Sequence, residues 1–327
     1  MSPSEQGNLL EVRGLRTWFP IRTGVLQRVK GHIRAVDGVE FNIRKGETLA
    51  LVGESGCGKS TLGYSILQLI ESQEGQVSFN GQDLCALPPE ELKDLRRKLQ
   101  IVFQDPMAAL NPRARIRDSI AEGMECFGIG DSDAERTQRV AELMERVGLD
   151  PRQMDRYPHE FSGGQRQRIC VVRALAVEPE FIVLDESVSA LDVSIQAQML
   201  NLLQGLQEEF GLTYLFITHD LGVVRYVADR VAVMYLGQIV EEGSTEQIFS
   251  APRHPYTRIL LSAVPSVDPD ERTQPLQVRG EVPSPSNPPS GCRFHPRCPD
   301  AVDRCSAESP DLEPRPGGGV RCFLAPE

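Results

Sequence analysis

Residues 53–60 read Gly-Glu-Ser-Gly-Cys-Gly-Lys-Ser, which fits the phosphate-binding pattern G-x-x-x-x-G-K-[ST]. A short apolar run at 48–52 precedes the motif and a helical pattern over 59–70 follows it, so the loop joins a strand to a helix. The glycines allow backbone N–H groups to curl around phosphate oxygens at the positive end of the helix dipole. Lys59 would reach the β- and γ-phosphates, and the Ser60 hydroxyl would bind Mg²⁺. The strand–helix setting disfavours the alternative of an ordinary glycine-rich turn.

A pair of carboxylates follows a second apolar run. Residues 181–184 are Phe-Ile-Val-Leu, and Asp185 and Glu186 come directly after them. Ligands of open α/β sheets bind at the carboxyl ends of the strands. We therefore expect Asp185 to hold Mg²⁺, directly or through water, and Glu186 to polarise an attacking water. Taken alone, the pattern is more typical of a strand that ends at solvent, and the phosphate loop gives it meaning.

A second anion site is indicated at residues 162–165, Ser-Gly-Gly-Gln, which precede a helical pattern over 164–176. Ser162 is a favoured helix-capping residue, and the two glycines leave the first N–H groups of the helix accessible.

Short apolar runs alternate with helical patterns over the first 265 residues, which indicates an α/β fold with a mostly parallel sheet. Alternating apolar residues at 35–43 predict one further strand. Helical patterns are also predicted over 134–147 and 195–210. Residues from about 90 to 160 are rich in helix formers and predict an inserted helical subdomain.

The chain has 327 residues, which suggests one large domain with an appendage or two domains. No run of 18 apolar residues occurs, and residues 1–8 lack the layout of a signal peptide, so we expect a cytosolic protein. The net charge of −11 argues against a nucleic-acid partner, because such surfaces normally need a basic excess.

More than half of the 24 prolines lie after residue 264, so this tail cannot hold long helices or central strands. We expect either a disordered linker or a loop-rich extension held by something other than a hydrophobic core. Four cysteines fall within it, namely Cys292, Cys298, Cys305 and Cys322. They suit an iron–sulfur cluster, a zinc ion with His295 as an alternative ligand, or no metal at all.

Taken together, these motifs resemble the nucleotide-binding subunits of ABC transporters, and all five sequence elements of that family occur in its order. Residues 53–60 match the Walker A loop, Gln104 the Q-loop, residues 162–165 the signature, Asp185 and Glu186 the Walker B motif with residues 189–192 as the D-loop, and His219 the switch histidine. Phe19 aligns with the aromatic residue that stacks on adenine, with Trp18 or core packing of either ring as alternatives.

The resemblance implies a P-loop NTPase fold of the ABC type, with a RecA-like core, an antiparallel β part, an inserted helical subdomain and a cysteine-containing C-terminal extension. ATP would lie between the Walker motifs of one subunit and Ser162, Gly163, Gly164 and Gln165 of another. Glu186 would act as general base, His219 would orient the γ-phosphate and Gln104 would sense Mg²⁺. Nucleotide contacts are implied for Phe19, Gly53, Ser55, Gly56, Cys57, Gly58, Lys59, Ser60, Thr61, Gln104 and Asp185, and Mg²⁺ ligation for Ser60, Gln104 and Asp185.

Residues 23–32, 254–257 and 280–289 narrow the likeness to ATPase subunits of dipeptide and oligopeptide importers, and most of all to the F-type dipeptide subunits. This implies a nucleotide-binding domain over 9–265 and an extension over 266–327. It also implies a paralogous ATPase partner, two permease subunits, an extracytoplasmic peptide-binding protein and a peripheral position on the cytoplasmic side of the inner membrane. A nickel or other small-solute importer is the first alternative, and a soluble non-transport ABC ATPase is the second. The family's association with a [4Fe–4S] cluster favours that group over zinc at the four cysteines.

Two positions depart from the wider family. Phe161 precedes the signature where Leu is commoner, and Ser187 follows the carboxylate pair where Pro is usual. Neither change removes a catalytic group, so we expect the nucleotide half-site to be active rather than degenerate.

Overall fold

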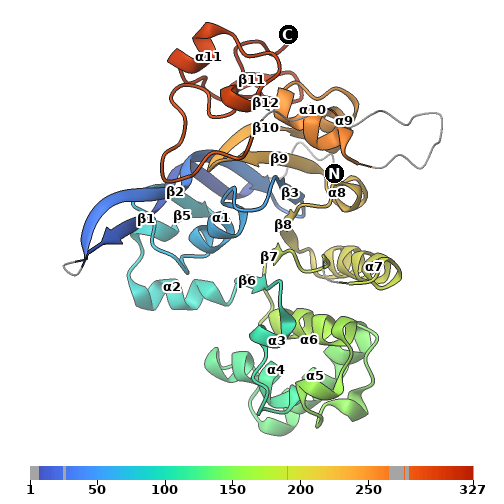
Figure 1. The fold of residues 1–327 in the computed structure, drawn as a ribbon. Helices are drawn as coiled ribbons and strands as arrows, with labels where there is room; N and C mark the ends of the chain where they lie inside the picture. The colour runs from blue at the N-terminus through green and yellow to red at the C-terminus, as the bar shows by residue number, and fades with distance from the viewer. Residues whose placement is uncertain (1–6, 25–26, 190, 265–275, 277–279, 327) are drawn as a thin grey trace. The chain divides into compact units, whose positions relative to one another are not determined.

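The computed structural model describes residues 7–24, 27–189, 191–264, 276 and 280–326. The chain forms two compact units, the first made of Met1–Cys85 with Ile217–Glu327 and the second of Ala86–Phe216. The first six residues of the polar N-terminus, position 190 of the D-loop and most of the linker over 265–279 lie outside the described residues. Figure 1 shows the course of the chain by colour.

An antiparallel sheet forms the N-terminal part of the first unit, in the strand order β2-β1-β4-β5. Its strands are β1 (Asn8–Thr23), β2 (Arg28–Arg44), β4 (Glu74–Phe79) and β5 (Gln82–Asp83). Buried Val36, Val39 and Phe41 alternate with more accessible residues along β2, so the strand predicted over 35–43 is confirmed.

A second group of strands in the first unit carries the phosphate loop. They are β3 (Thr48–Val52), β9 (Arg230–Tyr235), β10 (Gln238–Ser244), β11 (Glu313–Arg315) and β12 (Gly318–Val320). β3 runs parallel to β9, whereas β10 pairs antiparallel with β9 and β12. All five residues of β3 are buried, which explains its continuous apolar sequence.

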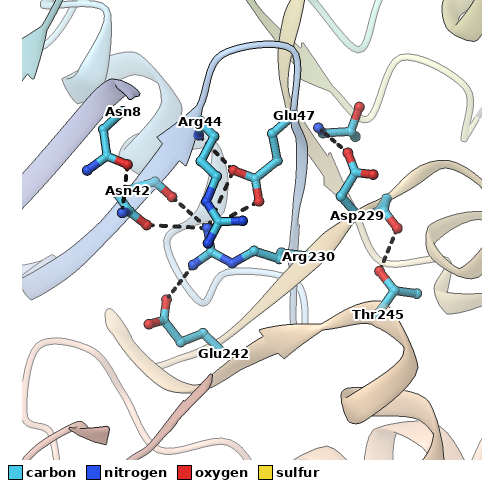
Figure 2. A network of polar contacts seen from close by, with 10 residues as sticks. Asn8, Asn42, Arg44, Glu47, Asp229, Arg230, Glu242 and Thr245 are labelled. Atoms are coloured by element: carbon cyan, nitrogen blue, oxygen red, sulfur yellow. Dashed lines mark hydrogen bonds and ion pairs between the residues drawn. The ribbon is translucent and has the colours of Figure 1, made fainter. Parts of the chain in front are cut away.

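A polar network around Arg230 joins these strands to the antiparallel sheet (Figure 2). The Arg230 guanidinium donates to the carbonyl of Asn42 at 3.1 Å and to the Glu47 carboxylate at 3.2 Å, and it pairs with Glu242 at 3.6 Å. Burial raises the pKa of Glu242, and the charge of Arg230 opposes that shift. Asp229 accepts a hydrogen bond from the backbone N–H of Thr48 at 2.8 Å. The network therefore sets where β3 begins.

Short helices complete the first unit: α1 (Lys59–Ile66), α8 (Leu221–Val227), α9 (Thr245–Ser250), α10 (Pro255–Ser262) and α11 (Asp303–Ala307). The 3-10 turns are η2 (Leu84–Ala86), at the boundary with the second unit, and η6 (His295–Arg297). His254 caps α10, because its Nδ1 accepts a hydrogen bond from the backbone N–H of Tyr256 at 3.1 Å. Burial lowers the pKa of His254 to about 3, so the ring is neutral, as this acceptor role requires.

The C-terminal extension is part of the hydrophobic core of the first unit. Phe294 is 1% exposed, and its ring centroid lies 5.2 Å from that of Tyr235 and 5.4 Å from that of Tyr256. The expectation of a linker or extension held by something other than a hydrophobic core is therefore wrong for residues 280–326. Proline excludes long helices, but it does not prevent a single aromatic side chain from entering a core formed by distant strands.

The second unit combines strands with the remaining helices. β6 (Leu99–Val102) runs parallel to β7 (Phe181–Asp185), and β8 (Thr213–Thr218) passes from this unit into the first. The helices are α2 (Pro89–Arg96), α3 (Pro106–Ala109), α4 (Ile116–Cys126), α5 (Asp133–Arg146), α6 (Gly163–Leu175) and α7 (Val193–Phe210), with the 3-10 turns η3 (Pro151–Gln153) and η4 (Pro158–Glu160). None of the helices in the described ranges is both long and apolar enough to cross a membrane.

Helix α5 shows why this part of the chain is helical. Ser132 caps it by accepting a hydrogen bond from the N–H of Glu135 at 3.2 Å, and Arg146 lies in the last turn, where its charge suits the helix dipole. Buried Val140, Leu143 and Met144 follow the helical spacing and face the core.

The position of Phe294 in the core generates a stability prediction. Replacing Phe294 with Ala should lower the free energy of unfolding of the first unit by roughly 3–5 kcal/mol, the usual cost of emptying a buried aromatic site. Trp18 is the only tryptophan and lies in β1, so its fluorescence during urea denaturation reports on this unit. The control is Val302→Ala, at a side chain that is 47% exposed, and it should change stability by less than about 0.5 kcal/mol. Equal effects of the two substitutions would contradict the packing described above.

Candidate functional site

The phosphate loop requires glycine at two positions because other backbone passes against it. Gly53 has φ of 154°, and a Cβ there would lie 2.2 Å from the carbonyl oxygen of Met234 in β9. Gly58 has φ of 110°, and a Cβ there would lie 1.9 Å from the carbonyl oxygen of Ala35 in β2. At either position a side chain would push the loop away from the strand that it packs against.

Helix α1 begins at Lys59, directly after the loop. Its N-cap residue is Gly58, which has no side chain that could cap the helix. The first N–H groups of a helix have no partner within the helix, and the helix dipole favours negative charge at this end. Ser60 and Thr61, the two predicted ligand residues that follow, lie in the first turn of the same helix. Ser55 and Gly56 lie in the exposed middle of the loop.

Lys59 is buried and donates hydrogen bonds from Nζ to the carbonyl oxygens of Gly53 at 2.8 Å and Glu54 at 3.1 Å. The ammonium group is thus held inside the curve of the loop by the loop's own backbone. Cys57 is also buried, and burial raises the pKa of its thiol. The carbonyl of Cys57 accepts a hydrogen bond from the N–H of Gly237 at 2.8 Å, which fixes the loop to the turn between β9 and β10.

In the second unit, β7 places the two predicted carboxylates at its carboxyl end. Asp185 is the last residue of the strand and is 2% exposed. Glu186 follows with φ of 44°, a left-handed conformation that is rare for residues other than glycine and that often occurs at functional sites. Gln104 donates from Nε2 to the Glu186 carboxylate at 2.9 Å, so the structure brings two predicted site residues together. Ser187, at the position where the wider family has Pro, is buried.

The signature residues form a capping box at the start of α6. Ser162 Oγ accepts a hydrogen bond from the N–H of Gln165 at 3.3 Å, and the Gln165 side chain accepts one from the N–H of Ser162 at 2.9 Å. These residues open into a surface pocket of the second unit, lined by Gly148, Leu149, Ser162, Gly163, Gly164, Gln165, Arg168, Leu191, Asp192, Ile195 and Gln198.

His219 follows β8 directly and is exposed. It lies in the first unit with Lys59 and the phosphate loop, whereas Gln104 and Glu186 lie in the second. Asp220 fixes the turn after it by accepting a hydrogen bond from the N–H of Gly222 at 2.9 Å.

The two candidate adenine-stacking rings have different surroundings. Phe19 is 36% exposed and lies in β1, which leaves its ring available as a stacking surface. Trp18 is partly buried, and the guanidinium of Arg34 lies 5.2 Å from its ring centroid. Since neighbouring residues of a strand point to opposite faces, only one of the two can face a nucleotide. The assignment to Phe19 stays a prediction.

The four terminal cysteines line one pocket together with Phe294 and His295. Every cysteine of the chain is free, and burial raises the pKa of the Cys298 thiol to about 11 and that of the Cys292 and Cys322 thiols above their ordinary value. Across the described ranges, however, no three His, Cys, Asp or Glu side chains form a group that could hold a metal ion. The cysteines are gathered, but not in the geometry of a single-ion site.

Sequence analysis missed three residues near Glu54 of the loop. Tyr256 and Arg297 form hydrogen bonds with Glu54, and the Tyr235 hydroxyl accepts a hydrogen bond from Arg297. Tyr256 lies within the 254–257 motif and Arg297 lies between two of the terminal cysteines, so both segments were noticed for other reasons. Because these residues lie far from the loop in sequence, no local pattern indicated that they contact it.

A glycine cradle with a buried lysine, a strand-end carboxylate pair and a capped Ser-Gly-Gly helix start define an ATP-binding cassette. The ABC transporter family model matches residues 36–189, and the model for the oligopeptide/dipeptide transporter C-terminal region matches residues 240–305. The chain belongs to the family of ABC transporter ATP-binding subunits, in the branch of the oligopeptide and dipeptide transporters.

Two curated relatives illustrate this membership. The chain is 51% identical to the oligopeptide transport ATP-binding protein AppF of Bacillus subtilis, over 99% of both chains. It is 48% identical to the dipeptide transport ATP-binding protein DppF of Haemophilus influenzae, over 98% of this chain and 97% of that one. The predicted family is therefore confirmed.

Solved structures support the fold. A dimeric post-hydrolysis structure of the ATP-binding cassette MJ0796, bound to ADP and Pi, matches with a TM-score of 0.65 and 30% identity, over 72% of this chain and 98% of that one. The predicted ABC-type P-loop NTPase fold and the assignment as an ATPase are confirmed.

The cradle generates a prediction about Gly58. Gly58→Ala should weaken ATP binding by about 10- to 100-fold, the scale expected when a backbone hydrogen bond to a charged phosphate group is lost. Binding of a fluorescent ATP analogue to the full chain measures this. Gly46→Ala is the matched control, because Gly46 also has a positive φ (77°) but its Cβ would meet nothing within 4 Å. It should cost about 1–2 kcal/mol of stability and leave ATP affinity intact. Retained affinity in Gly58→Ala would refute the steric account.

Proposed function

We propose that this chain is the ATP-hydrolysing subunit that powers uptake of di- or oligopeptides through an ABC importer. The observation that carries the proposal is similarity over nearly the whole chain to subunits named for oligopeptide and dipeptide transport. The match to the C-terminal region of such transporters adds to it, because residues 240–305 contain three of the four terminal cysteines.

The residues present fit nucleotide and magnesium. N–H groups of the phosphate loop and of the first turn of α1 would meet phosphate oxygens, and Lys59 would supply a buried cation. Ser60, Gln104 and Asp185 would hold Mg²⁺ through hydroxyl, amide and carboxylate oxygens, the ligand type that this ion prefers. When bound, the ion neutralises charge on the transferred phosphoryl group.

In the proposed hydrolysis, Glu186 is the general base that accepts a proton from the attacking water. Gln104 orients its carboxylate through the 2.9 Å hydrogen bond. His219 orients the γ-phosphate, and Lys59 neutralises charge that develops on it. Ser162, Gly163, Gly164 and Gln165 of a partner subunit contact the same ATP, because the capped start of α6 is a second anion site.

The proposal includes a set of partners and a location. The chain would pair with a paralogous ATP-binding subunit, contact two permease subunits through helices within residues 90–160, and serve an extracytoplasmic peptide-binding protein. It would be peripheral on the cytoplasmic side of the inner membrane. The division into a nucleotide-binding domain over 9–265 and an extension over 266–327 belongs to this proposal.

We further propose that Cys292, Cys298, Cys305 and Cys322 hold a [4Fe–4S] cluster. The shared pocket supports this. Four cysteine thiolates are the usual ligand set of such a cluster. Such a group would fix the loops of the extension to one another.

Transport by the assembled complex tests the function. The complex with its permeases and peptide-binding protein, reconstituted in vesicles, should accumulate peptides only with ATP. Glu186→Gln should lower ATP hydrolysis by about 10²–10⁴-fold, the usual contribution of general acid–base catalysis, while ATP still binds. Glu246→Gln, at an exposed residue of α9, is the control and should leave ATP hydrolysis and ATP binding unchanged. Undiminished turnover in Glu186→Gln would refute the base assignment, and uptake of nickel in place of peptides would refute the substrate class.

Metal analysis tests the cluster. Protein purified without oxygen should be brown and contain about four iron atoms and four inorganic sulfides per chain. Cys298→Ser with Cys322→Ser should abolish both, whereas Cys126→Ser, at an exposed cysteine outside the pocket, should abolish neither. One zinc per chain, or no metal in protein kept anaerobic, is the result that contradicts the proposal.

A further inference from the structure

Glu54, the second residue of the phosphate loop, is bound by the C-terminal extension. Its carboxylate accepts two hydrogen bonds from Arg297, from Nη1 to Oε2 at 2.9 Å and from Nη2 to Oε1 at 3.1 Å. Two parallel N–H···O bonds between guanidinium and carboxylate fix both the distance and the orientation of the pair. The side chains are 7% and 27% exposed for Arg297 and Glu54, so solvent screens the pair only partly.

Arg297 is itself held in place. Its guanidinium lies 5.8 Å from the ring centroid of Tyr235, and Nη1 is 3.4 Å from the Tyr235 hydroxyl. Nearby in the same segment, Arg293 is buried, pairs with Asp37 and donates to the carbonyl of Leu236. The guanidinium that meets Glu54 therefore projects from an anchored segment rather than from a free tail.

The backbone of Glu54 is bound on both sides as well. Its N–H donates to the hydroxyl of Tyr256 at 2.9 Å, and its carbonyl accepts from Lys59 Nζ at 3.1 Å. Tyr256 is fully buried, and its ring packs 4.7 Å from that of Tyr235. Displacement of Glu54 would consequently move both the start of the loop and the lysine that meets the phosphates.

We propose that Arg297 is a positioning residue, which fixes Glu54 and so holds the phosphate loop in the conformation that receives ATP. The inference rests on the proposed function, since it concerns the same nucleotide site. Arg297 does not touch the nucleotide in this account. It removes the conformational cost of ordering the loop when ATP binds, which is the general effect of preorganisation on affinity.

Titration of the full chain with ATP by calorimetry tests the proposal. Arg297→Lys keeps the charge but loses the two-pronged contact, and we expect the Kd for ATP to rise roughly 10- to 100-fold, as for loss of a hydrogen-bonded charge. Glu54→Gln alters the other partner of the same ion pair and should raise the Kd for ATP by a similar factor. The double variant should bind ATP no more weakly than the weaker single variant, because both substitutions remove one shared interaction.

The control is Arg258→Lys, which alters an ion pair to Asp300 that also joins the extension but lies on the surface. It should change the Kd less than about twofold. A purely structural role of Arg297 would lower the fraction of folded chains, and hence the number of binding sites, at an unchanged Kd. Unchanged Kd values in Arg297→Lys and Glu54→Gln, or additive losses in the double variant, would overturn the proposal. If the unsubstituted chain bound no ATP, the proposed function would fail together with it.

Discussion

The phosphate loop depends on one steric constraint, its passage against two backbone carbonyls. The positions where Gly53 meets Met234 and Gly58 meets Ala35 admit no Cβ, so the course of the loop is determined by β9 on one side and β2 on the other. Arg230, the first residue of β9, ties that strand to β2 through the carbonyl of Asn42, and it also pairs with Glu242 of β10 (Figure 2). The conformation of the loop thus depends on the strands that it packs against as well as on its own side chains.

The residues that we propose for ATP binding and hydrolysis come from both units of the chain. The first unit contains the phosphate loop, Lys59 and His219, the residues proposed to bind the charge already present on ATP. The second supplies Asp185 and Glu186 at the end of a buried strand and the capped helix start at Ser162. The described contacts that hold each set lie within its own unit.

Features encoded by neighbouring residues were predictable, whereas contacts between distant segments were not. Three features are each formed by residues that lie within about a dozen positions of one another in sequence: the phosphate loop, the carboxylate pair and the Ser162 cap. The structure forms all three. The helix predicted over 59–70 was too long, because α1 ends at Ile66 and Gln68 adopts a positive φ of 53°. Phe294 in the core and Arg297 on the loop depend on a return of the chain from far downstream. Proline content indicated which structures that segment lacks, but it carried no information about which core it joins.

The Glu54–Arg297 contact also orders events during synthesis of the chain. The two residues are 243 positions apart, so at roughly 5–20 residues per second a ribosome adds Arg297 about 10–50 s after Glu54. Met234 and Tyr256, which contact the same loop, are likewise synthesised long after it. A nascent polypeptide therefore contains the complete Walker A motif long before the residues that shape the loop have been synthesised. Products of premature termination would contain the motif without a complete nucleotide pocket.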